Sequence, residues 1–213
     1  METTGDVVVV RGEAELFART AHLFAVAEDV VCAANDLNTW AASRQHRSQQ
    51  RDLAGRSVRK LYRPGVLLEP GPAEHLRELE RLGAKVRITP DEINETIVLD
   101  QRLVILAGDT AQGERSYSVI ARLEIVQSVM SLFNAAWRAA TDVAVFDAAF
   151  AEVRALAPQI LDVLGSGCKD ETAARTLGLG LRTYRRRVAE LMSALGATSR
   201  FQAGARAREL GLV

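Results

Sequence analysis

A cluster of cationic side chains stands near the C-terminus of this chain. Residues 181–187 read LRTYRRR and contain four arginines, one threonine and one tyrosine. Guanidinium groups donate paired, coplanar hydrogen bonds that match phosphate oxygens and the major-groove edge of guanine, and hydroxyl groups also bind phosphate. These residue types favour recognition of a polyanion over acid–base or nucleophilic chemistry.

The arginines lie at the beginning of the helix that would carry them. From residue 181 onward, apolar residues recur at three- and four-residue intervals, which predicts an amphipathic helix with one buried face. They are Val188, Leu191, Met192 and Leu195. Cations at a helix N-terminus oppose the helix dipole, and double-stranded DNA is an external anion that would offset this cost. An isolated basic triplet is more commonly a solvated helix face, so its surroundings decide the interpretation.

The elements around this stretch are all helical. Two glycines between residues 177 and 181 make the tight link that is typical of a helix-turn-helix. Residues 151–213 carry ten Lys and Arg against six Asp and Glu, although the formal net charge of the whole chain is zero. The four predicted helices cover residues 146–167 with an interruption at Pro158, residues 170–178 with Asp170 as N-cap, residues 181–196, and residues 199–210.

Residues 164–203 resemble the LuxR/GerE-type helix-turn-helix of bacterial transcription regulators. The run LGSGCKDETAARTLGLGLRTYRRRVAELMSALGATSRFQA keeps the order of that family: a glycine-ended helix, an A-A-x-x-L-G helix, an R-T opening, and L-G-x-x-S-R before the last helix. The resemblance implies an all-α, four-helix DNA-binding domain over residues 144–213. The DNA-contacting residues that it implies are Lys169, Arg182, Thr183, Tyr184, Arg185, Arg186, Arg187 and Arg200.

Several positions depart from the pattern of the family. Gly180 takes the serine-like N-cap position, Tyr184 replaces the usual valine, and Arg187 replaces the common histidine. The base preference of the family therefore does not carry over to this chain. The first helix has Leu156 and Ala157 where the family has an Arg-Glu pair, so its backbone contacts do not carry over either.

The larger N-terminal part mixes helical and strand patterns. Residues 57–89 form a strand–helix–strand unit, which predicts a parallel or mixed sheet. Residues 96–108 form two strand patterns separated by the polar turn 100–102. The remaining predicted elements are a helix at 13–27, a buried strand at 29–36, a strand at 116–121 and a long helix at 122–140. The fold class predicted for residues 1–143 is therefore α+β, with helices packed on a mixed sheet.

Residues 86–109, VRITPDEINETIVLDQRLVILAGD, resemble the phospholipase D-like domain that TrmB sugar-responsive regulators place beside a DNA-binding module. Active enzymes of that class carry His-x-Lys on this strand with an aspartate further on. Here the strand carries Asn94, Glu95 and Thr96, and of that motif only Asp100 remains, in a turn where a carboxylate is usually structural. No catalytic residue is assigned, and we predict a domain that senses a signal or dimerises and is not an enzyme.

Cofactor and metal chemistry receive no support from the sequence. Cys32 and Cys168 are far apart and have no ligand spacing, so we expect two buried free thiols, no disulfide and no metal site. The three histidines fall on a helix, a polar stretch and another helix, away from any common motif. The N-terminus lacks a signal peptide or the acidic pair of a receiver domain, and no apolar run is long enough to span a membrane, so we expect a cytoplasmic protein.

Two segments keep alternative interpretations. Residues 44–63 carry seven Lys and Arg against the single acid Asp52, which fits a solvated loop, an accessory DNA contact or an anionic-ligand site. The helix at 122–140 has a broad apolar stripe that includes Phe133 and Trp137, and core packing and a dimer interface explain it equally well.

The function predicted from these features is that of a homodimeric, sequence-specific DNA-binding transcription regulator. Its partners would be double-stranded DNA and a second copy of the chain. A small-molecule effector in the old active-site cleft and contact with RNA polymerase remain open, and a membrane is not expected. The alternative is a signal-binding or ligand-binding sensor that acts through protein partners without reading DNA, with its helical tail used for docking.

Overall fold

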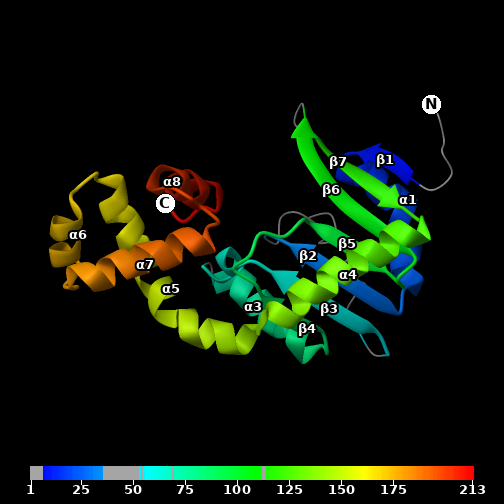
Figure 1. Ribbon diagram of the computed structural model, residues 1–213, viewed down its shortest axis with the longest axis horizontal. Coiled ribbons are helices and arrows are strands. Elements are labelled where there is room, and N and C mark those ends of the chain that lie inside the picture. Colours follow the sequence, from blue (N-terminus) through cyan, green and yellow to red (C-terminus); the bar gives the residue numbers. More distant parts are fainter. Residues whose placement is uncertain (1–6, 36–52, 54, 69, 112–113) are drawn as a thin grey trace.

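A computed structural model describes residues 7–35, 53, 55–68, 70–111 and 114–213 of the chain. A mixed eight-stranded sheet occupies one side of the molecule, and the helices of residues 143–213 occupy the other (Figure 1). We call residues 7–142 the sheet part and residues 143–213 the helical part. Within the described residues, no helix is long and apolar enough to cross a membrane.

The sheet has the strand order β1-β7-β6-β5-β2-β3-β4-β8. The strands β2, β3 and β4 run parallel to one another, whereas the other pairs are antiparallel. The bounds are β1 Val7–Arg11, β2 Asp29–Ala34, β3 Ser57–Tyr62, β4 Lys85–Ile88, β5 Thr96–Leu99, β6 Leu103–Ala111, β7 Glu114–Ile120 and β8 Thr141–Asp142.

Helices cover both faces of the sheet because successive residues of its central strands point to opposite sides. Val31 and Ala33 of β2 pack in the cluster that contains α4, and Cys32 and Ala34 pack in the cluster that contains α1 and α3. The helix bounds are α1 Glu13–Val26, α3 Pro70–Arg81, α4 Leu123–Ala139, α5 Val143–Gly165, α6 Asp170–Thr176, α7 Leu181–Ala194 and α8 Arg200–Glu209, with a short 3-10 helix η1 at Pro64–Leu67.

The predicted elements of the sheet part are present in the structure. The unit β3–α3–β4 is the predicted strand–helix–strand unit with parallel strands. The predicted hairpin joins β5 to β6 through the turn 100–102, in which Asp100 and Gln101 both have positive φ. Its Asp100 is structural, because Oδ1 accepts hydrogen bonds from the backbone N–H groups of Glu28 and Asp29 at 2.9 and 2.8 Å.

Three features differ from the prediction. The apolar run Val7–Arg11 is the edge strand β1, and Thr141–Asp142 is the short strand β8, which pairs with β4. Helix α5 runs through Pro158 without the predicted interruption. Proline removes one backbone hydrogen bond, to the carbonyl of Arg154, and Pro158 itself lies on the exposed side of the helix. Of the basic segment 44–63, residues 44–52 and 54 lie outside the described residues.

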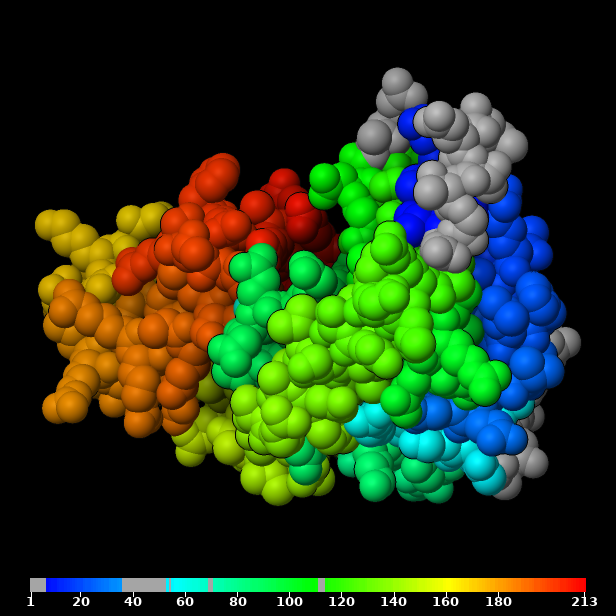
Figure 2. Space-filling view, turned by 45° about the vertical axis from the view of Figure 1, so that its right-hand side comes forward, coloured from blue at the N-terminus to red at the C-terminus, as the bar shows by residue number. Residues whose placement is uncertain are grey.

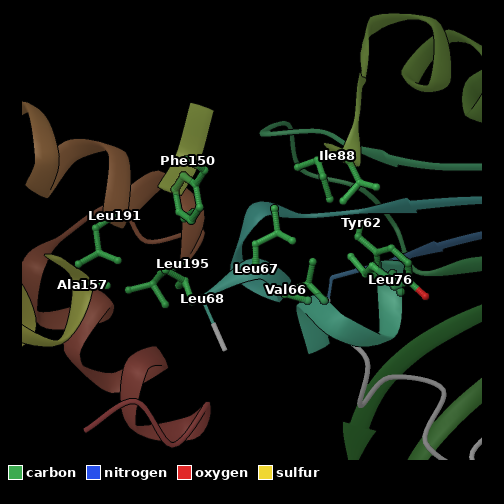
Figure 3. Close-up of a cluster of buried hydrophobic side chains, with 14 of the residues drawn as sticks. Tyr62, Val66, Leu67, Leu68, Leu76, Ile88, Phe150, Ala157, Leu191 and Leu195 are labelled. Carbon is green, nitrogen blue, oxygen red and sulfur yellow. The ribbon is translucent and has the colours of Figure 1, made fainter. Parts of the chain in front are cut away.

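One continuous core joins the sheet part to the helical part. Figure 3 shows Leu67 and Leu68, from the segment after β3, between Leu76 on the sheet side and Leu195 on the helical side. A Cβ on Gly65 would lie 3.0 Å from the carbonyl oxygen of Ala194, so η1 packs closely against the end of α7. The two parts are therefore in direct contact through a buried apolar junction.

Candidate nucleic-acid interface

Helices α6 and α7 are joined by a short turn that glycine makes feasible. Gly178 has a φ of +66°, which is the left-handed region that glycine adopts without strain. The N–H of Leu179 donates to the carbonyl of Ala174 at 2.8 Å, and the N–H of Gly178 donates to that of Arg175 at 3.1 Å. This turn sets the angle between α6 and α7, at the end of the molecule away from β1 (Figure 1).

The inward face of α7 is apolar and buried. Val188, Leu191 and Leu195 belong to the core, as the sequence pattern predicts. Tyr184 belongs to the same face and is only 1% exposed, and burial raises the pKa of its hydroxyl. The prediction that its ring contacts DNA is therefore corrected: residue 184 lies four before Val188 and seven before Leu191, so helical periodicity turns it inward.

Arg187 also points away from solvent, which corrects its assignment as a DNA-contacting residue. Its side chain is 12% exposed and is ion-paired with Glu152 of α5 and, at 2.9 Å, with Glu190 of α7. The residue lies three after Tyr184 and four before Leu191, at the border of the buried face. Arg187 thus joins α7 to α5, and this contact leaves it no free donor fork for a nucleic acid.

The outward face of α7 carries the other three arginines. Arg182 is exposed, and no carboxylate of the described residues lies within 4.0 Å of it. Arg186 is 61% exposed and has only a long contact of 3.8 Å with Glu190. Arg185 is 57% exposed, and its Nε donates to Asp170 at 2.8 Å, which leaves its terminal amino groups for other acceptors. The outward face is therefore a cationic surface near the N-terminus of the helix.

Asp170 organises the cations around this surface. Its two carboxylate oxygens accept hydrogen bonds from Arg185 of α7 at 2.8 Å and from Arg200 of α8 at 2.7 Å. These two bonds lower the pKa of Asp170 to about 2, with that from Arg200 contributing most. The predicted N-cap role is wrong, because Lys169 is the N-cap of α6 and no side chain caps that helix. The carboxylate instead connects α6, α7 and α8.

The remaining predicted contact residues have different exposures. Lys169 at the start of α6 is exposed, Thr183 is half-buried on α7, and Arg200 is about half exposed beside Asp170. Sequence reasoning missed Arg175, which is exposed in the last turn of α6, and Ala189, which is exposed one turn beyond Arg185. Four-residue spacing from Arg185 was the signal that would have placed Ala189 on the same face.

The segment that resembles a phospholipase D motif carries a buried, ion-paired glutamate in place of a nucleophile. Glu95 is buried at the start of β5, is ion-paired with Arg115 of β7, and accepts a hydrogen bond from the N–H of Asn35 at 3.2 Å. Among the described residues, no cluster of His, Cys, Asp and Glu is arranged to hold a metal ion. Cys32 is a buried free thiol, as expected, whereas Cys168 is half-buried.

The sequence is similar to that of a named regulatory protein. No protein-family model matches the sequence. The chain is 32% identical over 162 residues to the bialaphos biosynthetic pathway regulatory protein of Streptomyces hygroscopicus. The match covers 76% of this chain and 63% of that relative, so the chain spans less than two thirds of the length of the relative.

Solved structures are similar to this fold at low sequence identity. TrmBL2, an archaeal chromatin protein with a novel mode of DNA binding, aligns with a TM-score of 0.51 at 15% identity, over 67% of this chain and 55% of that chain. Nuc of Salmonella typhimurium, a phospholipase D family member, aligns with a TM-score of 0.46 at 15% identity, over 64% of this chain and 98% of that chain. The likeness to TrmBL2 shows a shared fold alone.

Proposed function

We propose that this chain is a transcription regulator of the LuxR/GerE type that binds DNA with α7 as its recognition helix. The observation that carries the proposal is the outward face of α7, where Arg182, Arg185 and Arg186 are exposed while the opposite face is locked in the core. Cations held at the N-terminal half of a helix, against its dipole, suit insertion into the major groove, where guanidinium groups meet guanine edges and phosphates.

Two similarities to known proteins support the proposal. The relative from Streptomyces hygroscopicus is named as a regulatory protein, and TrmBL2 is a chromatin protein that binds DNA. For this chain we propose double-stranded DNA as the partner, with Lys169 and Arg200 as backbone contacts beside α7. We also propose that the sheet part is non-catalytic, because β5 carries no His-x-Lys motif.

We further propose that two copies bind a two-fold operator. Paired modules would place their recognition helices in successive major grooves, about 34 Å apart, with phosphate contacts fixing the register and base-edge contacts giving specificity. Sedimentation of the complex with selected DNA measures the stoichiometry. A single copy bound to a site without two-fold symmetry would reject the dimer while leaving the recognition helix in place.

The experiment is a selection of bound fragments from random DNA, followed by fluorescence anisotropy on the selected duplex at several salt concentrations. We expect Arg186→Ala and Arg185→Ala each to weaken binding by about 1–3 kcal/mol and to relax the preference at one base pair if the side chain reads a base. If the replaced arginine contacts a phosphate, its loss should instead make the salt dependence of binding shallower by about one contact.

The matched control is Arg102→Ala. Arg102 is exposed in the turn between β5 and β6, so this change removes the same charge from the sheet part. Binding by Arg185→Ala and Arg186→Ala that equals binding by the control would reject α7 as the recognition helix. If the wild-type chain selects no sequence and shows no salt dependence, the alternative of a sensor that acts through protein partners is favoured.

A further inference from the structure

Two arginines from distant parts of the chain meet at the junction between the sheet part and the helical part. Arg63 directly follows β3, and Arg206 belongs to α8. A Cβ on Gly196 would lie 2.7 Å from Nη1 of Arg63 and closer still to Nη1 of Arg206, so both guanidinium groups reach the same point. Like charges repel at such short range, so this arrangement needs a compensating charge.

The described residues do not supply that charge in direct contact. No carboxylate among them lies within 4.0 Å of either guanidinium group. Arg63 donates to the carbonyl of Pro90 at 3.2 Å, and Arg206 donates to the carbonyl of Leu195 at 2.8 Å, and both of these acceptors are neutral. Nε of Arg63 is buried and has no partner. Burial, and secondly the charge of Arg206, lower the pKa of Arg63, and the more distant carboxylates of Glu92 and Asp91 offset only part of this effect.

The pair borders two hollows with different charge balance. The smaller, of about 350 Å³, is lined by three arginines and three glutamates, including the ion pair Arg115–Glu95. The larger, of about 640 Å³, is lined by four arginines, with Glu92 as its single acid. These arginines are Arg63, Arg185, Arg200 and Arg206. Figure 2 shows the orange and red C-terminal helices in contact with the green residues of the sheet part.

We propose that Arg63 and Arg206 bind the oxyanion of a small metabolite, a phosphate or a carboxylate, in the larger hollow. An oxyanion accepts paired hydrogen bonds from both guanidinium groups and neutralises both charges. A volume of about 640 Å³ is typical of small-molecule sites. A small anion fits better than duplex DNA, because Arg63 is half-buried at the junction and its Nε is closed to solvent.

A bound anion would affect α7, because an arginine of that helix lines the same hollow. Arg185 and Arg200 line the same hollow and bind Asp170, so an anion there competes with Asp170 for both side chains. Arg185 also belongs to the outward face of α7. Binding of the oxyanion stands independently of the proposed function, whereas an effect of the oxyanion on DNA binding rests on it.

The test is a titration of the full chain with inorganic phosphate and, in a parallel arm, with succinate, at constant ionic strength adjusted with chloride. Calorimetry and the thermal midpoint are the readouts, because a ligand that binds only the folded state raises the midpoint in a saturable way. We expect saturable binding in at least one arm, which also identifies the oxyanion class. Arg63→Gln and Arg206→Gln should each weaken it by about tenfold or more, and Arg102→Gln should leave it unchanged.

Arg63→Lys is a second variant for the case that Arg63→Gln does not fold, because lysine keeps the positive charge and removes only the paired donors of the guanidinium group. We expect it to bind phosphate more weakly than the wild type and more tightly than Arg63→Gln. Equal, non-saturating rises of the midpoint in all variants would show a general salt effect and overturn the proposal.

DNA is the remaining alternative occupant of this site. If phosphate and succinate do not bind, while Arg63→Gln and Arg206→Gln make the salt dependence of DNA binding shallower, the pair contacts the DNA backbone and the proposal is wrong. Arg186→Ala separates the two proposals, because it tests α7 without touching this site. Loss of DNA binding in Arg186→Ala, with no oxyanion binding by the wild type, would reject only the oxyanion site.

Discussion

The two faces of α7 use arginine in opposite ways. On the outward face, Arg186 is 61% exposed and contacts Glu190 only at 3.8 Å. On the border of the inward face, Arg187 is 12% exposed and is paired with two carboxylates. The two residues are neighbours in the chain and identical in type. Their roles differ because one step along a helix rotates the side chain by about 100°, which is enough to exchange solvent for protein.

The largest expected effect comes from the buried side of this comparison. Leu191→Ala removes a fully buried side chain from the core, so we expect the free energy of unfolding to fall by about 2–5 kcal/mol. Urea denaturation followed by circular dichroism measures the change. Arg186→Ala on the outward face is the control and should change stability by no more than about 0.5 kcal/mol. Similar losses in the two variants would mean that the outward face is also packed.

A smaller effect is expected from Arg187. Arg187→Ala leaves Glu152 and Glu190 without their shared cation, and we expect a loss of stability of about 1–2 kcal/mol, limited because Glu152 is exposed and regains water. Denaturation measures the loss, and anisotropy on selected DNA measures the salt dependence. The salt dependence should match that of the wild type. A shallower salt dependence, with unchanged stability, would mean that Arg187 contacts DNA as the outward arginines are proposed to do.

The fold was largely predictable from the sequence because its signals are local. The apolar, β-rich runs of the strands and the polar turn at Asp100 each depend on residues close in the chain. The edge strand β1 and the two-residue strand β8 were missed because each is a short segment whose sequence alone does not distinguish a strand from a loop. Their pairing is set by distant strands.

The candidate site was predictable only in part. The position of the arginines on one helix followed from the pattern, and carrying the apolar period back from Val188 would also have turned Tyr184 inward. The partners of the arginines were not predictable, because Asp170 lies on another helix and Glu152 on a third. Arg63 and Arg206 are 143 positions apart in the sequence, and they meet only because the sheet part packs against the helical part. Only the tertiary structure brings such pairs together.

The smallest effect concerns Asp170, which joins the outward arginine Arg185 to Arg200. Because its pKa is lowered from 3.8 to about 2 in the folded chain, Asp170 stabilises the fold fully above pH 4 and loses that contribution as the pH falls toward 2. The full shift would correspond to about 2 kcal/mol, and solvent screening of the half-exposed arginines reduces the expected contribution to about 1 kcal/mol.

Asp170→Asn tests this contribution, since asparagine keeps the shape of the side chain without its charge. Urea denaturation at pH 6, 4, 3 and 2.5 should show the wild type more stable by about 1 kcal/mol at pH 6, with the difference vanishing toward the lowest pH. In the same variant, release of Arg185 and Arg200 should make the salt dependence of DNA binding steeper, because two more cations then reach phosphate. Equal stability of the wild type and Asp170→Asn at every pH would mean that residue 170 acts through its shape and not through its charge, which would contradict this prediction.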